Sequence, residues 1–190
     1  NLIFISKGEV KAMTTLISNN CYGVAYEKAK KVDYTTPFFS VFIFAQDYIT
    51  FLESFDQYIA MTPRISKGNI SRHYKYPRKY PVLLIGECNI EIHCAHDKKG
   101  AQDSVDKWCR RRDRMDLDKS KMIVKLCDRD KFRPKLGHRF LALDQFPNKR
   151  LFISHKWKEE ITGDDVILVP VSGTRCPIGT TLEKLHPVLN

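Results

Sequence analysis

No run of apolar residues in this chain of 190 residues approaches the about 18 to 20 that a membrane-spanning helix needs. The nearest candidate, residues 38–45, is far shorter. Residues 1–5 are apolar, but they are too few for a signal peptide and no small-residue cleavage site follows them. These absences predict a cytoplasmic protein without a transmembrane segment.

Cys-x-x-Cys pairs are also absent, although the chain contains six cysteines. A chain of this length without a signal peptide is not expected to be a disulfide scaffold, so we expect reduced thiols. The closest group of metal-ligand residue types comprises Cys88, His93, Cys94 and His96. The spacing of this group matches no common zinc frame, and neighbours on one strand point to opposite faces, so we expect no bound metal.

Low complexity is absent too, because glycine and proline number only nine each, and a hydrophobic fraction of 43% excludes wholesale disorder. The excess is in positive charge, since 32 Lys and Arg against 22 Asp and Glu give a net charge of +10. We expect one α/β domain over residues 1–190, with residues 1–12 and 170–190 peripheral. The chain begins without Met, which suggests a fragment of a longer polypeptide.

Segments typical of strands and helices alternate along the chain. Strands are predicted at residues 14–18, 40–44, 82–85, 90–94, 121–127, 150–154 and 166–169. Helices are predicted at residues 24–32, 47–59, 102–115 and 134–143. The alternation favours a three-layer α/β fold, in which a mostly parallel sheet carries helices on both faces, as in Rossmann-like and SGNH-like proteins.

Residues 62–81 interrupt this alternation with prolines and basic residues, and they predict a long basic loop. The tail from Pro170 is rich in turn residues and is expected to pack loosely. In an open parallel sheet the ligand lies beyond the carboxyl ends of the strands. The segments that follow predicted strands are residues 19–23, 45–47, 93–97, 128–130 and His155. Their richness in Asn, Cys, His and Asp makes that edge the predicted site.

Several groups of residues stand in an order typical of one protein family. They are residues 17–23, 42–44 with Asp47, 51–53, 90–93 with His96, 107–108 with Arg110, Arg111 and Arg114, and Lys125 with residues 128–130. In this order they resemble a bacterial family of exopolysaccharide (capsule) biosynthesis proteins, long described as a domain of unknown function. The resemblance implies a role in making or modifying a polysaccharide, and it favours functional roles for His93 and His96.

The turn at residues 18–23 opens a predicted helix, so its backbone amides suit a phosphate or an oxyanion. Cys21 is a candidate nucleophile, and Asn20 is a candidate oxyanion donor. Asn19 and Gly23 are candidate cofactor contacts. The alternative is structural, with the two Asn residues capping the helix and Cys21 packed beneath it.

Three further candidates follow predicted strands. His93 and His96 are candidate general bases for a sugar hydroxyl or amine, because histidine titrates near neutral pH. Either could instead be a structural histidine bonded to the backbone. Asp128 is a candidate catalytic residue that, with Asp130, could hold a divalent metal, orient a histidine or cap the next turn.

The predicted helix at residues 102–115 carries the remaining candidates. The proposed cofactor-binding side chains on it are Trp108, Arg110, Arg111 and Arg114. Guanidinium groups bind phosphates bidentately, and Trp can stack on a base or a sugar ring. The alternative is a solvated helix held down by Trp108, with the Arg residues paired to neighbouring Asp residues.

These candidates together favour an acetyltransferase that uses acetyl-CoA to modify a sugar or a nucleotide amino sugar. The alternatives are a glycosyltransferase or other nucleotide-sugar enzyme, and a non-catalytic binding module of polysaccharide assembly. Much of the excess charge falls in residues 64–79 and 107–114, which we interpret as a cradle for a phosphorylated small molecule. No nucleic-acid motif or amphipathic membrane anchor is visible, so neither partner is expected, and the oligomeric state is not indicated.

Overall fold

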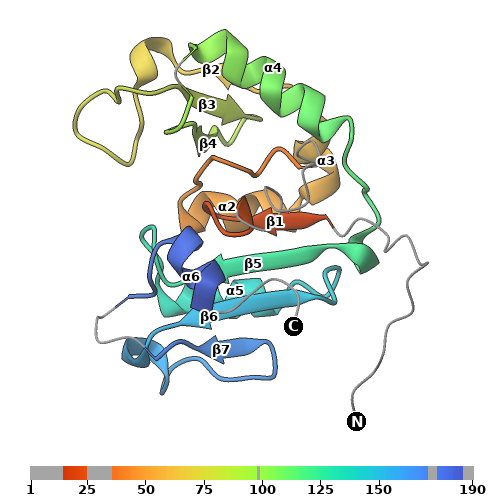
Figure 1. Cartoon of the computed structure of the whole chain (residues 1–190), viewed down its shortest axis with the longest axis vertical. Helices are drawn as coiled ribbons and strands as arrows, with labels where there is room; N and C mark the ends of the chain where they lie inside the picture. The colour runs from red at the N-terminus through yellow and green to blue at the C-terminus, as the bar shows by residue number, and fades with distance from the viewer. Residues whose placement is uncertain (1–14, 25–35, 98, 171–174, 186–190) are drawn as a thin grey trace.

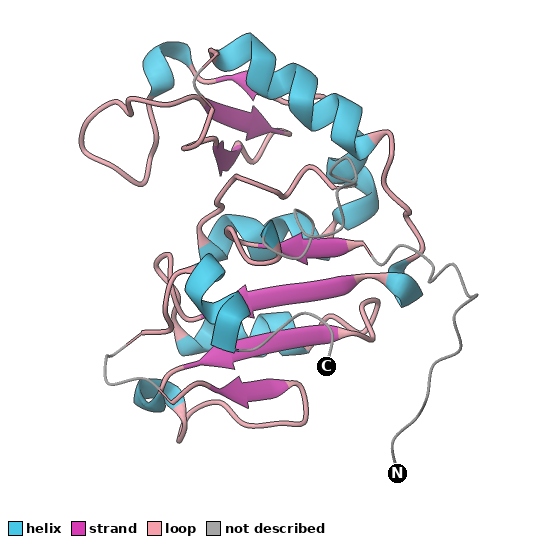
Figure 2. Ribbon diagram, in the orientation of Figure 1, coloured by secondary structure: helices cyan, strands magenta, loops and turns pink. Residues whose placement is uncertain are grey.

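A computed structural model describes residues 15–24, 36–97, 99–170 and 175–185 of the chain (Figure 1). Its main sheet contains β1 (Leu16–Ser18), β5 (Ile123–Cys127), β6 (Lys149–Ile153) and β7 (Val166–Leu168), in that spatial order. Every pairing in this sheet is parallel, so the carboxyl ends of the strands share one edge (Figure 2). The predicted α/β class and mostly parallel sheet are confirmed.

Helices cover both faces of the main sheet. They are α2 (Ala45–Glu53) and α5 (Pro134–Leu141) on one face and α6 (Gly179–Leu185) on the other (Figure 1). Successive side chains of a strand point to opposite faces, which divides the core into two clusters. Ile17 of β1 belongs to the cluster that contains α2, whereas its neighbour Leu16 packs with Leu182 of α6.

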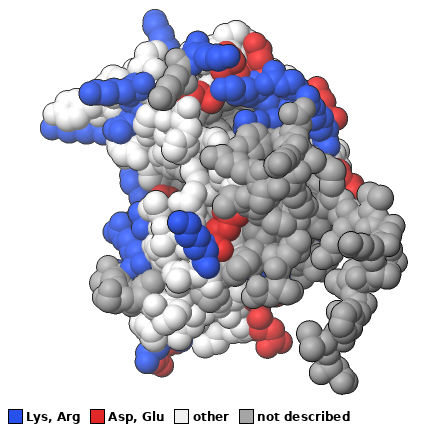
Figure 3. All heavy atoms as spheres, viewed as in Figure 1, with Lys and Arg blue, Asp and Glu red and all other residues white. Residues whose placement is uncertain are grey.

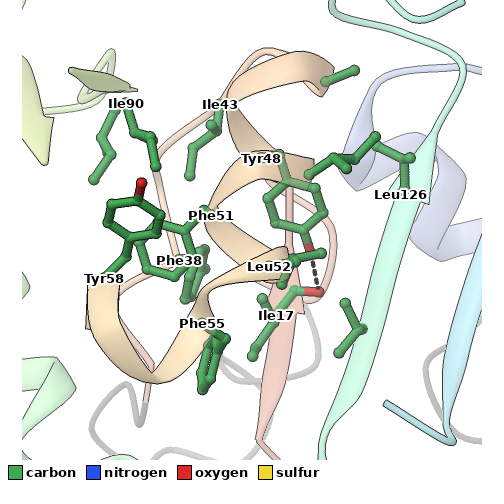
Figure 4. Packing of buried hydrophobic residues seen from close by; sticks show 14 of the residues in the cluster. Ile17, Phe38, Ile43, Tyr48, Phe51, Leu52, Phe55, Tyr58, Ile90 and Leu126 are labelled. Carbon is green, nitrogen blue, oxygen red and sulfur yellow. Dashed lines mark hydrogen bonds between the residues drawn. The ribbon is translucent and has the colours of Figure 1, made fainter. Parts of the chain in front are cut away.

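The larger cluster is built around α2. The Tyr48 hydroxyl donates a hydrogen bond of 3.0 Å to the Ile17 carbonyl oxygen, which ties α2 to β1 (Figure 4). The ring of Phe51 meets that of Phe38 edge-on at 5.4 Å. Burying one such side chain contributes about 1.5 to 3 kcal/mol. The helix predicted at residues 47–59 is present, but a break at Ser54 divides it into α2 and α3 (Phe55–Ala60).

A second, smaller sheet lies beside the main one. It contains β2 (Arg64–Ile65), β3 (Val82–Ile85) and β4 (Ile90–His93), and both of its pairings are antiparallel. The helix α4 (Ala101–Arg112) packs on β2 and β3. The strands predicted at residues 82–85 and 90–94 therefore exist, but they pair with each other as a hairpin outside the parallel sheet.

The strand predicted at residues 40–44 is wrong. Ser40 has a φ of 62°, which breaks the extended run, and Phe42 forms only an isolated bridge to His93. The run is apolar because it connects the two core clusters, with Phe39 buried in one and Ile43 in the other.

Two other predictions concern the ends of the chain. Apart from its first residue, the helix predicted at residues 24–32 lies outside the described residues. The tail after Pro170 was expected to pack loosely, yet Cys176 and Leu182 are fully buried. Leu182 lies on α6, which covers one face of the sheet, so the described part of this tail contributes two side chains to the core.

Short 3-10 turns complete the described structure. They are η1 (Lys67–Asn69), η2 (Lys119–Lys121) and η3 (His155–Trp157). Among the residues that the structure describes, no helix has the length and apolar character needed to cross a membrane.

Candidate active site

Polar side chains meet at the carboxyl edge of the main sheet, as predicted. A cavity of about 280 Å³ opens at this edge. Its lining comprises Asn20, Cys21, His96, Arg129, Asp130, Ile178, Gly179 and Thr180. These residues come from the turn after β1, the segment after β4, the segment after β5 and the region where α6 begins. Both sheets and the C-terminal helix therefore contribute to one cavity.

Cys21 and His96 form a close pair in the wall of this cavity. The Cys21 Sγ lies 3.4 Å from the His96 Nε2, although the two residues are 75 positions apart in the chain. Cys21 is half-buried and His96 is exposed. Burial raises the pKa of the Cys21 thiol, the Asp130 carboxylate raises it further, and Lys125 opposes both effects. Cys21 therefore rests as a thiol, and His96 is placed to receive its proton.

Lys125 orients the two Asn residues beneath the cavity. This fully buried side chain donates a hydrogen bond of 2.9 Å to the Asn20 Oδ1 and one of 3.4 Å to the Asn19 Oδ1. With their carbonyl oxygens held there, both amide nitrogens turn towards the Asp130 Oδ2, at 3.3 Å from Asn19 and 3.4 Å from Asn20. The Asn19 side chain is thereby fully enclosed, whereas Asn20 remains at the cavity wall.

Asp130 occupies a constrained turn at the same wall. Its φ is 56° and that of the next residue, Lys131, is 62°, so two consecutive non-glycine residues are left-handed. Such residues cost of order 1 to 3 kcal/mol each and are concentrated at functional sites. Burial raises the pKa of the Asp130 carboxyl, while the Asn20 amide, Lys125 and Arg129 lower it.

Gly179 allows α6 to close the cavity. A Cβ atom at this position would lie 2.5 Å from the Tyr22 backbone nitrogen and 2.6 Å from the Asn20 Oδ1, so only glycine fits without a shift. Arg129 lines the same wall and donates 2.8 Å to the Cys176 carbonyl oxygen. Sequence reasoning missed Gly179, and the spacing of Leu182 and Leu185 was the available sign that a helix follows it.

Gly23, a predicted cofactor contact, packs against β1. Its φ is 89°, and a Cβ atom there would lie 1.8 Å from the Leu16 Cδ2. Glycine is therefore required for the turn to lie against β1. The structure does not place Gly23 in the cavity wall.

Asp128 joins three segments of the chain. Its Oδ2 accepts hydrogen bonds from the Ser154 backbone nitrogen at 2.8 Å and from the Ser154 hydroxyl at 2.5 Å. Its Oδ1 accepts 2.6 Å from the Cys176 backbone nitrogen. Asp128 thus caps the ends of neighbouring segments and does not line the cavity. Among the described ranges, no three His, Cys, Asp or Glu side chains gather in a way that could hold a metal ion.

His93 lies in a separate group of largely buried titratable residues, which we call the sealed cluster: Asp47, His73, Glu91 and His93. The His93 ring is fully buried, stacks on Phe42 at 4.5 Å and places its Nε2 3.2 Å from the Glu91 Oε2. Burial lowers the pKa of His93 to about 4, against the opposing effect of Glu91. His93 is therefore neutral near pH 7 and, unlike His96, does not reach the cavity.

The candidates on α4 also lie away from the cavity. Trp108 is only 2% exposed and packs against Phe38 with ring centroids 5.5 Å apart, so its indole is part of the core and does not stack on a ligand. Arg111 donates 2.8 Å to the Phe39 carbonyl oxygen, while Arg110 and Arg114 are exposed. The alternative prediction for this helix, in which Trp108 holds it down, agrees with the structure.

The excess of positive charge is distributed differently from the predicted cradle. Lys and Arg side chains gather over the part of the molecule that holds α4 and the antiparallel sheet (Figure 3). Among the residues that the structure describes, none of residues 64–79 or 107–114 lines the cavity, and Arg129 is its cationic side chain. The two basic segments need an explanation other than the Cys21 cavity.

A parallel α/β sheet with a Cys–His pair beyond its carboxyl ends defines this protein structurally. The chain belongs to the family described as Domain of unknown function (DUF1919), which matches residues 6–165. A Haemophilus influenzae (strain Rd) protein named "Uncharacterized protein" is 27% identical over 143 residues, which cover 75% of this chain and 62% of that protein. The chain thus spans less than two thirds of this curated relative, and neither description states an activity.

Proposed function

We propose that this chain carries a thiol-dependent acyltransferase site that moves an acetyl group from acetyl-CoA to a sugar or a nucleotide amino sugar. The observation that carries the proposal is the 3.4 Å contact between the Cys21 Sγ and the His96 Nε2 at a cavity of about 280 Å³. A thiol, a base and a cavity are the three requirements of covalent acyl transfer. The sugar acceptor, the link to exopolysaccharide and a cytoplasmic location belong to the proposal and rest on the sequence.

The first half-reaction loads the enzyme. Cys21 gives its proton to His96, and its sulfur forms a bond to the acetyl carbon of the thioester. Asn20 lines the cavity, and its amide would donate to the oxyanion on exchanging its 3.4 Å contact with the Asp130 Oδ2 for the substrate. The bond from the acetyl carbon to the CoA sulfur then breaks, and His96 returns the proton to give free CoA. Arg129 is the cavity side chain suited to a phosphate group of the donor.

The second half-reaction unloads the enzyme. His96 removes a proton from the hydroxyl or amine of the acceptor, which attacks the acetyl carbon held on Cys21. The carbon–sulfur bond breaks, and the proton passes from His96 to the Cys21 thiolate. Because His96 is exposed, an acceptor can approach it from solvent.

The test is a search for the acetyl-enzyme. The chain is incubated with acetyl-CoA, and acetyl transfer is followed by intact mass, peptide mapping and release of free CoA. We expect one acetyl group on Cys21 and none in Cys21→Ser, whereas Cys88→Ser, which changes an exposed cysteine outside the cavity, retains it. Absence of an adduct and of CoA release with every amino sugar and nucleotide sugar offered contradicts the proposal.

A non-catalytic binding module is the second candidate, and one observation favours it. Burial raises the pKa of the Cys21 thiol, which makes it less reactive than a solvated thiol. Under this alternative, Cys21→Ala leaves the affinity for a sugar ligand unchanged and no acetyl-enzyme forms. The glycosyltransferase alternative gains less support, because both Asp128 oxygens already accept hydrogen bonds from protein groups.

A further inference from the structure

The basic excursion, residues 62–81, is the most strongly charged part of the chain that the proposed reaction does not use. It leaves the body after α3 and returns at β3, and it extends beyond the antiparallel sheet as a wide loop (Figure 1). It holds six Lys and Arg residues and no Asp or Glu. A segment with charge of one sign only is suited to an anionic surface.

The middle of the excursion is anchored to the sealed cluster. The Ser71 hydroxyl and the Arg72 backbone nitrogen both donate to Glu91, the latter at 2.7 Å. The Arg72 guanidinium pairs with Asp47, and the His73 Nε2 lies 3.0 Å from the Asp47 Oδ2. The two carboxylates are nearly inaccessible to solvent, so these contacts fix the path of the excursion. The residues on either side of this anchor are therefore held at the surface by a fixed backbone.

The outer residues combine unpaired positive charge with exposed apolar surface. Lys67, Lys75 and Lys79 are exposed, and within the described part of the chain they make no ion pair. Between them in sequence, Ile70 is 61% exposed and Tyr76 is 67% exposed. Single exposed apolar side chains are common, but these two stand among unpaired lysines, which gives the excursion both components of an interfacial anchor.

We propose that the basic excursion binds the surface of an anionic lipid membrane. The three lysines would lie at the phosphate level, while Ile70 and Tyr76 enter the boundary between headgroups and acyl chains. A nucleic acid would use the same positive charge, but an exposed isoleucine has no ring to stack on a base. The anchor is a loop and not an amphipathic helix, so helical periodicity in the sequence does not reveal it.

Vesicle sedimentation tests the proposal with the 190-residue chain. It is mixed at low ionic strength with vesicles of phosphatidylcholine alone or with phosphatidylglycerol added. We expect binding only to the anionic vesicles. The triple change Lys67→Gln, Lys75→Gln and Lys79→Gln is expected to weaken binding roughly 100-fold, since each lysine near an anionic surface contributes about five-fold. The double change Ile70→Ser and Tyr76→Ser is expected to weaken the binding that remains at high ionic strength, where the charge contribution is screened.

A matched control separates the excursion from net charge. The changes Lys135→Gln, Lys156→Gln and Lys158→Gln remove three exposed lysines from α5 and the region of η3. This variant is expected to bind anionic vesicles almost as well as the unchanged chain. Equal loss in both triple variants, or no binding of the unchanged chain to anionic vesicles, overturns the proposal.

A second experiment, with a nucleic acid in place of vesicles, distinguishes between the two anionic partners. Binding of a single-stranded oligonucleotide is measured by fluorescence anisotropy at the same ionic strength. We expect oligonucleotide binding to be weak and insensitive to Ile70→Ser and Tyr76→Ser. Tight oligonucleotide binding that the excursion triple variant abolishes, without vesicle binding, would assign this surface to nucleic acid and overturn the membrane assignment. Every outcome is independent of the acyl-transfer proposal, because the excursion does not line the Cys21 cavity.

Discussion

Two regions of this molecule hold a histidine close to another titratable side chain, and they differ in access to solvent. In the Cys21 cavity, His96 is exposed and faces a thiol across 3.4 Å. In the sealed cluster, His93 is fully buried under Phe42 and faces Glu91 across 3.2 Å. The same residue type therefore lies at an open cavity in one place and in an enclosed anchor in the other. Access to a cavity, rather than residue type, distinguishes the two roles.

The histidines themselves give the largest expected difference. His96→Gln is expected to lower the acetyl-transfer rate by roughly 10² to 10⁴, the usual contribution of a general base, while stability changes by less than about 0.5 kcal/mol. The matched change His138→Gln alters an exposed histidine on α5 and is expected to affect neither. Pre-steady-state release of CoA and thermal unfolding measure the two quantities. Equal rates in the two variants would remove His96 from the reaction.

Asp47 gives the largest expected effect on stability. Its buried carboxylate accepts from the Glu91 backbone nitrogen at 3.1 Å and contacts His73 and Arg72, so Asp47→Ala leaves the buried Glu91 nitrogen and the half-buried His73 without this partner. We expect the free energy of unfolding to fall by about 3 to 5 kcal/mol in a urea titration. Asp56→Ala, which removes an exposed carboxylate paired with Lys119, is expected to cost at most about 1 kcal/mol. Similar losses of stability in the two variants would show that burial of the carboxylate does not determine its contribution.

Acid should weaken the sealed cluster in a defined pH range. The pKa of His93 is lowered from its ordinary 6.5 to about 4, mainly by burial, while Glu91 and Asp47 oppose the shift and His73 adds to it. The unfolded chain binds this proton first, so stability is complete above pH 6.5 and falls as the pH drops towards 4.

We expect the free energy of unfolding to decrease by roughly 1 to 3 kcal/mol across that range through His93. Chemical denaturation at several pH values measures the decrease. His93→Leu should reduce the pH dependence, and an unchanged pH dependence in that variant would assign it to other groups.

Gly179 provides a test of the cavity wall. Gly179→Ala places a Cβ atom 2.5 Å from a backbone nitrogen, so α6 must shift, at a cost of about 1 to 3 kcal/mol. The neighbouring change Thr180→Ala adds no atoms and is expected to cost less than about 0.5 kcal/mol. Thermal unfolding of both variants gives the comparison, and a fully stable Gly179→Ala variant would show that α6 does not close tightly over the turn.

The main sheet could be predicted from the sequence because each of its strands is a short apolar segment. The segment at residues 40–44 is similarly apolar and is not a strand, since Ser40 has a φ of 62° and Phe42 forms only an isolated bridge to His93. A local pattern of apolar residues indicates that a segment is buried, but it does not indicate which strand the segment pairs with. For the same reason the β3–β4 hairpin could be recognised as strands but not as a separate sheet.

The candidate site was predictable as a set of residues and not as an arrangement. Asn20, Cys21 and His96 were all expected at strand ends, and the structure brings them together. His93 is three residues from His96 and was indistinguishable from it, because burial under Phe42 depends on contacts distant in sequence. The position of Trp108 on its helix is compatible with stacking on a ligand or with packing in the core. The contacts in the structure place it in the core.

Cys21 and His96 follow strands of two different sheets, and this has a consequence for folding. Cys21 follows the first strand of the parallel sheet, and His96 follows the last strand of the antiparallel one. A contact over 75 residues forms only after both sheets have docked, because closing such a loop is entropically unfavourable until other contacts compensate. A newly made or partly unfolded chain therefore holds its cysteine apart from its base. The thiol and the imidazole therefore come within 3.4 Å of each other only in a chain in which both sheets are in place.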